Sequence, residues 1–85
     1  MYRVELRRSS QKALDRLQKQ ELFKIISTLV ELEQNPRPKG IEKIRGTELW
    51  RIREGDYRLI YHIDDGKKII TVVRIGHRRD VYRGI

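Results

Sequence analysis

The chain of 85 residues contains no cysteine, one tryptophan, one phenylalanine and two prolines. The lack of cysteine excludes a disulfide framework, a thiolate nucleophile and thiolate metal ligands. No apolar run approaches the roughly 18 residues that a membrane-spanning helix needs, and no apolar segment of the secretory type follows Met1. We therefore expect a cytoplasmic protein that makes no contact with a membrane.

Acidic residues are scarce relative to basic ones. The chain has 12 Asp and Glu against 20 Lys and Arg, which gives a net charge of +8. Such an excess on one small domain favours a polyanionic partner, most often nucleic acid. The length predicts a single domain, residues 1–85, with no room for a deep pocket around a large cofactor. The two histidines and the scattered carboxylates lack the spacing of metal ligands, so we expect neither a cofactor nor a metal.

The N-terminal half has the pattern of one short strand and two helices. Residues 2–6 alternate between polar and apolar, and Ser9 and Ser10 offer an N-cap for the first helix. Two apolar series follow, and they point in directions that differ by roughly 100° or more around one helix axis. We therefore predict a break near residues 18–21, a helical hairpin, and an end of the second helix at Asn35-Pro36. The first series is Ala13, Leu14 and Leu17; the second is Leu22, Phe23, Ile25, Ile26, Leu29, Val30 and Leu32.

From Leu49 onward the period of the apolar residues changes to two, and we predict three strands at about 49–54, 57–63 and 68–75. Gly55-Asp56 suits a type II′ turn, and Asp65-Gly66 suits a type I′ turn. The predicted order is β-α-α-β-β-β. This is an α+β domain in which the helical hairpin packs on one face of a mostly antiparallel four-stranded sheet.

A two-residue loop at Gly55-Asp56 determines which residues of the adjoining strands share a face. Opposed residues of an antiparallel pair lie on the same face, and this loop sets Arg53 opposite Arg58. Like charges in that position destabilise a sheet, which favours a bound anion there; a solvated outer face is the simpler alternative. The face expected to pack on the helices holds Trp50, Ile52, Tyr57, Leu59 and Tyr61, and the opposite face holds Arg51, Arg53, Arg58, His62 and Ile60.

The last predicted strand and the tail carry the second concentration of functional side chains. Residues 69–73 are apolar on both faces, so the C-terminal segment or a partner chain must cover the second face. Gly76 would let the chain turn back toward the arginines, where Tyr82 would either stack on a nucleobase or lock the tail. The charged and aromatic residues of the tail are Arg74, His77, Arg78, Arg79, Asp80, Tyr82 and Arg83.

Three segments together resemble the RelE/ParE superfamily of type II toxins: NPRPKG at 35–40, IRGTELWRIREGDYRLIY at 44–61 and VVRIGHRRDVY at 72–82. The resemblance implies a RelE-like fold and a toxin held inactive by a small antitoxin protein. RelE-like members cleave mRNA in the ribosomal A site, with rRNA as a further contact, whereas ParE-like members inhibit DNA gyrase. The resemblance also implies a toxin that is itself monomeric within a toxin–antitoxin hetero-oligomer.

Matched by motif, the resemblance implies a site formed by Arg51, Arg53, Arg58, Arg78 and Tyr82. RelE-like enzymes need no metal: the 2′-OH attacks the adjacent phosphate and leaves a 2′,3′-cyclic phosphate and a 5′-OH. The better-known RelE enzymes carry lysines at the positions of Arg51 and Arg53. Because arginine stays charged, we expect these two residues to bind phosphate and stabilise the transition state rather than to take up a proton. His77 is the favoured base and His62 the alternative, since histidine titrates near neutrality.

The expected catalytic residues are therefore Arg51, Arg53, Arg58, His77, Arg78 and Tyr82, and the expected RNA-binding residues are Arg51, Arg53, Arg58, His62, Arg79 and Arg83. Two other functions stay open. One is a ParE-like gyrase inhibitor that is not an enzyme; the other is a catalytically inactive RNA-binding or corepressor module. A helix or strand of an acidic antitoxin would neutralise the arginines and cover the apolar outer face at Ile60, Ile69, Thr71 and Val73.

Overall fold

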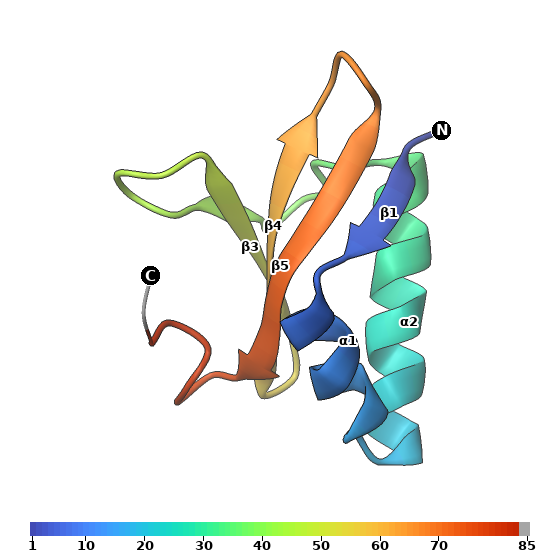
Figure 1. Cartoon of the computed structure of the whole chain (residues 1–85), viewed down its shortest axis with the longest axis vertical. Helices are drawn as coiled ribbons and strands as arrows, with labels where there is room; N and C mark the ends of the chain where they lie inside the picture. The colour runs from blue at the N-terminus through green and yellow to red at the C-terminus, as the bar shows by residue number, and fades with distance from the viewer. Residues whose placement is uncertain (84–85) are drawn as a thin grey trace.

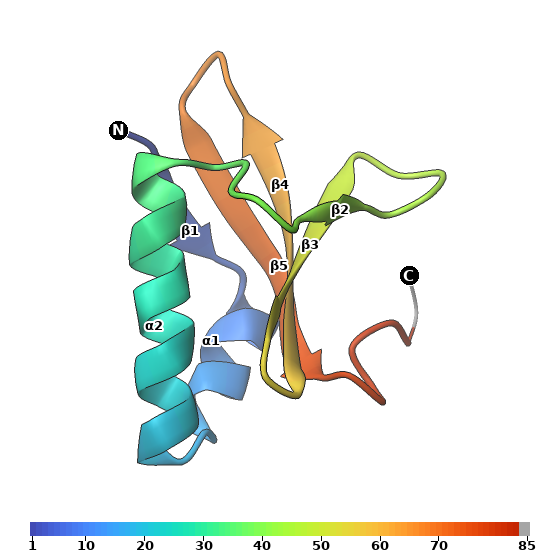
Figure 2. The ribbon, with the colours of Figure 1, turned by 180° about the vertical axis from the view of Figure 1, so that it is seen from behind.

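The computed structural model describes residues 1–83, which form a helical hairpin on one face of a five-stranded sheet (Figures 1 and 2). The elements are β1 (Arg3–Leu6), α1 (Arg8–Asp15), α2 (Lys19–Gln34), β2 (Glu42–Lys43), β3 (Leu49–Glu54), β4 (Tyr57–Asp64) and β5 (Ile69–His77). The strand order is β1-β5-β4-β3-β2. Only β1 and β5 are parallel, and the other neighbours are antiparallel. The predicted α+β class, with both helices on one face, is confirmed.

The sheet has one more strand than the sequence predicts. The additional strand, β2, has two residues: Glu42 lies opposite Arg51, and Lys43 lies opposite Trp50. Two residues are too few to display an alternation, so the sequence pattern does not reveal this strand. Its pairing brings a carboxylate beside Arg51.

The register of β3 and β4 is the predicted one. Arg53 lies opposite Arg58, and Trp50 lies opposite Tyr61. Gly55 has a positive φ of 60°, and Asp56 does not, as a type II′ turn requires.

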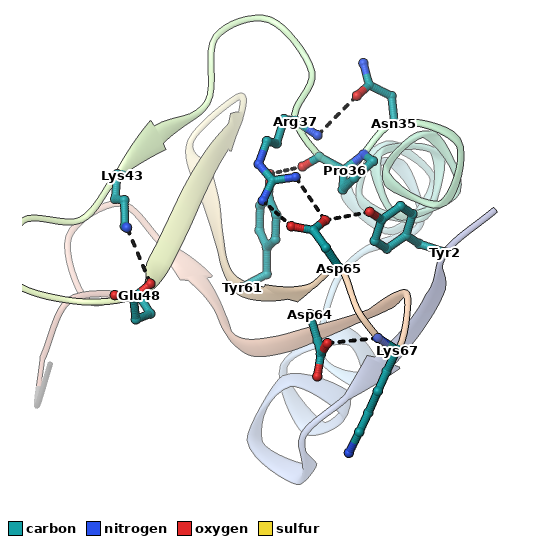
Figure 3. A network of polar contacts seen from close by, with 10 residues as sticks. All are labelled: Tyr2, Asn35, Pro36, Arg37, Lys43, Glu48, Tyr61, Asp64, Asp65 and Lys67. Atoms are coloured by element: carbon teal, nitrogen blue, oxygen red, sulfur yellow. Dashed lines mark hydrogen bonds and ion pairs between the residues drawn. The ribbon is translucent and has the colours of Figure 1, made fainter.

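The turn between β4 and β5 differs from the predicted type I′ turn. Asp64 pairs with Ile69, which leaves a four-residue loop at 65–68, and the positive φ of 55° falls on Lys68. The Asp64 carboxylate accepts a hydrogen bond from the amide of Lys67 at 2.9 Å (Figure 3). This local side-chain contact stabilises a wider loop than a two-residue turn allows.

The prediction that Ser9 or Ser10 caps α1 is wrong. The N-cap is Arg7, which makes no side-chain capping bond. The hydroxyl of Ser10 is buried and donates to the carbonyl of Val72 at 3.0 Å, and that of Ser9 donates to the carbonyl of Val73 at 3.4 Å. The serines therefore tie the helix to β5, a partner that the local sequence does not identify.

The hydrophobic core lies between the two helices and one face of the sheet. Its buried members are Leu14, Ile25, Leu29, Leu32, Leu59, Tyr61, Ile63, Ile70, Val72 and Ile75. The five residues predicted for the helix-facing side of β3 and β4 all belong to this core or pack against it. The second apolar series of the sequence is only partly buried, since Phe23, Ile26 and Val30 are exposed on α2.

The C-terminal segment covers part of the opposite face. Val81 and Ile60 are 2% and 0% exposed, yet neither belongs to the core under the helices. The prediction that Gly76 turns the chain is wrong, because β5 continues through His77. A Cβ at Gly76 would lie 3.5 Å from the Cβ of Val81, so the glycine leaves room for that side chain. Ile60 is thus covered without a partner, whereas Ile69, Thr71 and Val73 are half-buried.

A polar network fixes the segment that crosses from α2 to β2 (Figure 3). Arg37 donates to both carboxylate oxygens of Asp65, at 3.1 and 2.9 Å, and the hydroxyl of Tyr2 donates to the same carboxylate at 2.6 Å. The hydroxyl of Tyr61 donates to the carbonyl of Pro36 at 3.0 Å. The crossing segment is therefore fastened to β4 and to the β4–β5 loop before it enters β2.

We expect Asp65→Asn to lower the urea midpoint of unfolding at pH 7 modestly. The hydrogen bonds from Arg37 and Tyr2 lower the pKa of Asp65 from 3.8 to about 2. A folded-state pKa below the unfolded one stabilises the fold above about pH 4, and this stabilisation is lost as the pH falls toward about 2. The difference between variant and wild type should therefore close over that range. Asp15→Asn is the control, and a difference that stays constant down to pH 2 would contradict the assignment.

No helix among residues 1–83 is both long and apolar enough to cross a membrane.

Candidate functional site

The sheet surface that faces away from the helices, here called the arginine face, carries Arg51 and Arg53 on β3 and Arg58 on β4. The guanidinium of Arg58 donates to the carbonyls of Gly55 and Tyr57, both at 2.9 Å. These contacts draw Arg58 toward the β3–β4 turn and ease its repulsion with the opposed Arg53. The predicted clustering of the three arginines on one face is present.

Arg51 is the best-fixed cation of this face. One guanidinium nitrogen, Nη1, donates to the hydroxyl oxygen of Tyr82 at 2.7 Å, and Nη2 lies 3.0 Å from a carboxylate oxygen of Glu42. The guanidinium carbon also lies 5.7 Å from the centre of the Tyr82 ring. The hydrogen bonds to Tyr82 and Glu42 raise the pKa of Arg51, so it is a permanent cation. Its side chain is 28% exposed, which leaves donors available to a ligand.

Glu42 is a site residue that the sequence analysis missed. The same carboxylate oxygen that contacts Arg51 lies 3.8 Å from Nη2 of Arg53, and half of the Glu42 side chain is exposed. No sequence signal marks this glutamate, because its position depends on the path of the crossing segment and on a two-residue strand. Glu42 is a carboxylate held directly against two of the predicted phosphate-binding arginines.

A pocket of about 370 Å³ adjoins Arg51 and Tyr82, lined also by Lys43, Ile44 and Arg45. It combines an aromatic and an aliphatic surface with three cations. A smaller pocket of about 210 Å³ lies between α2 and the β3–β4 turn, where Glu21, Glu54 and Asp56 contribute to the lining. Its three carboxylates would repel a polyanion. We therefore place the candidate site at the pocket beside Arg51 and Tyr82.

The tail brings Arg78 to the same turn as Arg58. The amide of Arg78 donates to the carbonyl of Asp56 at 2.8 Å, and its Nε lies 4.0 Å from the Asp56 carboxylate. Arg74 donates to the carbonyls of Val81 and Arg83 and so ties the end of the described chain to β5. These contacts hold the segment that carries Tyr82 over the arginine face.

The two histidines occupy different faces of the sheet. His77 lies opposite Tyr57, with ring centres 5.9 Å apart in an edge-to-face arrangement, on the helix side of the sheet. Its Nδ1 accepts a hydrogen bond from the amide of Arg79 at 3.2 Å. The favoured base is therefore not brought to the arginines. His62 lies on the arginine face opposite Leu49, one diagonal position from Arg51.

A β-bulge explains the position of His77. Strict alternation from Thr71 and Val73 would put His77 on the arginine face. The register shifts between Ile60 and Tyr61, so that Arg74 lies opposite Ile60 and Val72 lies opposite Tyr61. The extra residue reverses the faces of all later positions in β5, which is a common effect of bulges near functional sites.

The two remaining RNA-binding candidates of the tail, Arg79 and Arg83, are exposed. Arg83 lies 3.4 Å from the carboxylate of Asp80. Among residues 1–83, no group of three or more His, Asp and Glu side chains is arranged to hold a metal ion. The groups that the arginine face offers to a ligand are guanidinium cations, the Glu42 carboxylate, the Tyr82 phenol and the His62 imidazole.

Comparison with known proteins shows which family has a similar sequence. Residues 4–82 match the family described as the ParE toxin of the type II toxin–antitoxin system, parDE. Toxin RelG of Mycobacterium tuberculosis is 48% identical over 31 residues, an alignment that spans only 36% of each chain.

Two solved structures resemble the whole domain. The archaeal RelE–RelB complex from Pyrococcus horikoshii OT3 has a chain with a TM-score of 0.83 and 31% identity, covering 94% of this chain and 98% of that one. A chain of the intact Escherichia coli RelBE toxin–antitoxin complex has a TM-score of 0.80 and 25% identity, and the match covers 91% of this chain and 96% of that one. Since the family match spans nearly all of the described residues and the fold agrees with it, the chain belongs to the RelE/ParE superfamily and is the toxin of a type II toxin–antitoxin system.

Proposed function

We propose that this toxin is an endoribonuclease that cleaves mRNA on the ribosome through attack of a 2′-OH, without a metal ion. The observation that carries the proposal is the gathering of Arg51, Tyr82 and Glu42 within direct contact on the arginine face. Cations, a carboxylate and a phenol are the groups that such a reaction needs for charge stabilisation and proton transfer.

The arginines would bind the scissile phosphate. A guanidinium presents paired N–H donors that fit two phosphate oxygens, and Arg51 is already oriented by Tyr82. Arg53 is exposed and Arg58 is held nearby on the neighbouring strand, so both would reach the same phosphate region. The negative charge that develops on phosphorus oxygens in the transition state would be stabilised there.

Glu42 is the proton acceptor in this proposal. The proton of the 2′-OH passes to the Glu42 carboxylate as the 2′ oxygen bonds to phosphorus and the bond from phosphorus to the 5′ oxygen breaks. The hydroxyl of Tyr82 donates a proton to the leaving 5′ oxygen, since its own oxygen already accepts a hydrogen bond from Arg51. Arg78 would assist the leaving group, and His62 is the alternative acceptor on this face.

The pocket beside Arg51 would hold a base of the message. The ring of Tyr82 and the side chain of Ile44 supply apolar surface, and Lys43 and Arg45 supply cations for the flanking phosphates. Stacking of a base on an aromatic ring contributes about 1–3 kcal/mol. Message and rRNA are therefore the proposed nucleic-acid partners, with Arg79 and Arg83 as exposed contacts.

An antitoxin is the proposed protein partner. The similar structures from Pyrococcus horikoshii and Escherichia coli are complexes of RelE with RelB. In this chain the half-buried residues Ile69 and Thr71 lie on the arginine face beside β1, and the half-buried Val73 follows them at the bulge. An acidic helix or strand placed there would cover apolar surface and neutralise the arginines at once.

The function is tested by adding the purified chain to a translating ribosome system and mapping the 5′ ends of the message. Naked RNA and a gyrase supercoiling assay are run in parallel. New 5′-OH ends that appear only with ribosomes support the proposal. Blocked supercoiling without cleavage would assign the ParE-like function instead, and binding to RNA with steep salt dependence but no cleavage would assign an inactive binding module.

We expect Glu42→Gln to slow message cleavage by about 100-fold or more, because general base catalysis contributes roughly 10²–10⁴-fold. RNA binding should be unchanged or tighter, since a negative charge is removed from beside Arg51 and Arg53. Glu48→Gln is the matched control, as Glu48 is 83% exposed and contacts only Lys43 among the described residues. Cleavage by Glu42→Gln within a few-fold of wild type would transfer the acceptor role to His62.

A further inference from the structure

The Glu42 carboxylate is held on the arginine face by a strand with very little backbone pairing. β2 has two residues, Glu42 and Lys43, which lie opposite Arg51 and Trp50 of β3. Because the side-chain period of a strand is two, a slip of one residue would carry Glu42 to the helix side of the sheet. A strand this short therefore needs side-chain contacts to keep its register.

The ion pairs of Glu42 are not enough to hold it during the proposed reaction. They join the carboxylate to Arg51 at 3.0 Å and to Arg53 at 3.8 Å, and half of the Glu42 side chain is exposed. Exposed ion pairs contribute little to stability. A phosphate bound by the same two arginines also competes with the carboxylate for their N–H donors. A contact on the other face of the sheet is therefore needed to keep Glu42 in place when the message binds.

Trp50 supplies such a contact on the helix side of the sheet. Its half-buried ring packs against the core. The Nζ of Lys43 lies 5.6 Å from the ring centre and the guanidinium carbon of Arg37 lies 5.8 Å from it, within the range of cation–π contacts. Ile41, the other neighbour of Glu42, also packs against the core. With Ile41 and Lys43 both held on the helix side, the alternation of an extended chain directs Glu42 to the arginine face.

We propose that Trp50 is a positioning residue for Glu42. Its ring holds the cations on either side of Glu42 along the chain, and so keeps the carboxylate beside Arg51 while the arginines bind phosphate. This role rests on the proposed function, in which Glu42 accepts the proton. Trp50 touches neither the message nor the reacting atoms, since it faces the opposite side of the sheet from Arg51. Its loss should therefore lower kcat and leave the KM for the message nearly unchanged.

Amide hydrogen exchange measures the hold of Trp50 on β2 whether or not the chain cleaves RNA. The amide of Ile44 donates to the carbonyl of Leu49 at 2.9 Å, so its protection reports on the closed pair of β2 and β3. Trp50→Leu should lower this protection by about five-fold or more, because two cation–π contacts are lost, and Trp50→Phe should keep most of it. Glu42→Gln should lower it by less than about two-fold. Unchanged protection in Trp50→Leu, or an equal loss in Glu42→Gln, would overturn the proposal.

Message cleavage on the ribosome tests whether that hold acts through Glu42. Trp50→Leu should lower kcat by about ten-fold or more with KM within about two-fold, because a displaced base is no longer aligned with the 2′-OH. In the Glu42→Gln background the same substitution should cost less than about two-fold, since the carboxylate that it displaces is already gone. An equal loss in both backgrounds would show that Trp50 acts elsewhere. If Glu42→Gln cleaves like the wild type, the acceptor role fails and the kinetic part of this proposal fails with it, whereas the exchange result bears on Trp50 alone.

The matched control is Tyr57→Leu. Tyr57 is a half-buried aromatic residue of β4 that packs against the same core as Trp50. Its ring contacts His77 at a centre distance of 5.9 Å, and it lies opposite Glu54 at the turn end of the hairpin, away from β2. Tyr57→Leu should leave the exchange of β2 and the kcat within about two-fold of wild type. Losses as large as those of Trp50→Leu would attribute both effects to general packing of the core and would overturn the proposal.

Discussion

Arg51→Ala should slow ribosome-dependent message cleavage by about 100-fold to 1,000-fold, the usual effect of removing one donor that stabilises charge in a transition state. Arg51 contacts both proposed proton-transfer groups, at 2.7 Å to Tyr82 and 3.0 Å to Glu42. Its loss would therefore remove a phosphate ligand and also free the phenol and the carboxylate to move. No other residue of the arginine face makes both contacts among the described residues.

Two variants separate these effects. Arg51→Lys keeps the charge but loses the planar fork, so we expect intermediate activity with message binding largely retained. Arg3→Ala is the matched control, because Arg3 is an exposed arginine of the same sheet whose one ion pair within residues 1–83 is with Glu5. Mapping of message 5′ ends measures the rate, and thermal unfolding checks the fold. An Arg51→Ala variant that cleaves within a few-fold of wild type would remove Arg51 from the proposed mechanism.

Leu32→Ala should destabilise the fold by about 2–5 kcal/mol, the cost of deleting a buried leucine and leaving a cavity. Leu32 is 0% exposed and lies in the core on the inner side of α2. A domain of this size has a total stability of roughly 5–10 kcal/mol. The substitution therefore brings the chain close to unfolding at physiological temperature, and it does so without touching the arginine face.

The matched control for Leu32→Ala lies on the outer side of the same helix. Ile26 is 43% exposed, so Ile26→Ala should cost less than about 1 kcal/mol. Urea unfolding followed by circular dichroism measures both. Equal losses for the two variants would mean that the inner and outer sides of α2 are packed alike, contrary to the structure.

The candidate site is assembled from three parts of the chain that are distant in sequence. The strands supply Arg51, Arg53 and Arg58, the tail supplies Tyr82, and the crossing segment supplies Glu42. The network of Arg37, Asp65 and Tyr2 fastens that crossing segment. The Arg37 guanidinium carbon and the Lys43 Nζ also lie 5.8 and 5.6 Å from the centre of the Trp50 ring, so cation–π contacts hold both ends of the segment against β3.

The sequence by itself determined those features that depend on neighbours along the chain. A two-residue turn at Gly55-Asp56 and an unbroken alternation on both sides are enough to set Arg53 opposite Arg58 and to gather the arginines on one face. The change of apolar direction between the two helices and the stop before Pro36 depend equally on local pattern. The motifs that carried the family resemblance lie in the same local stretches.

Only the tertiary structure decided the rest, because each of the remaining features needs a contact between distant segments. The bulge opposite Ile60 turned His77 to the helix side, and β2 brought Glu42 to Arg51. Ser10 bonds to β5 instead of capping its helix, and Val81 fills the space above Gly76. The apolar series of α2 was visible in the sequence, but which half of it the core would bury depended on where the sheet lies. An apolar pattern shows that one side of a helix is suited to burial, but which apolar residues become buried depends on the element that packs against the helix.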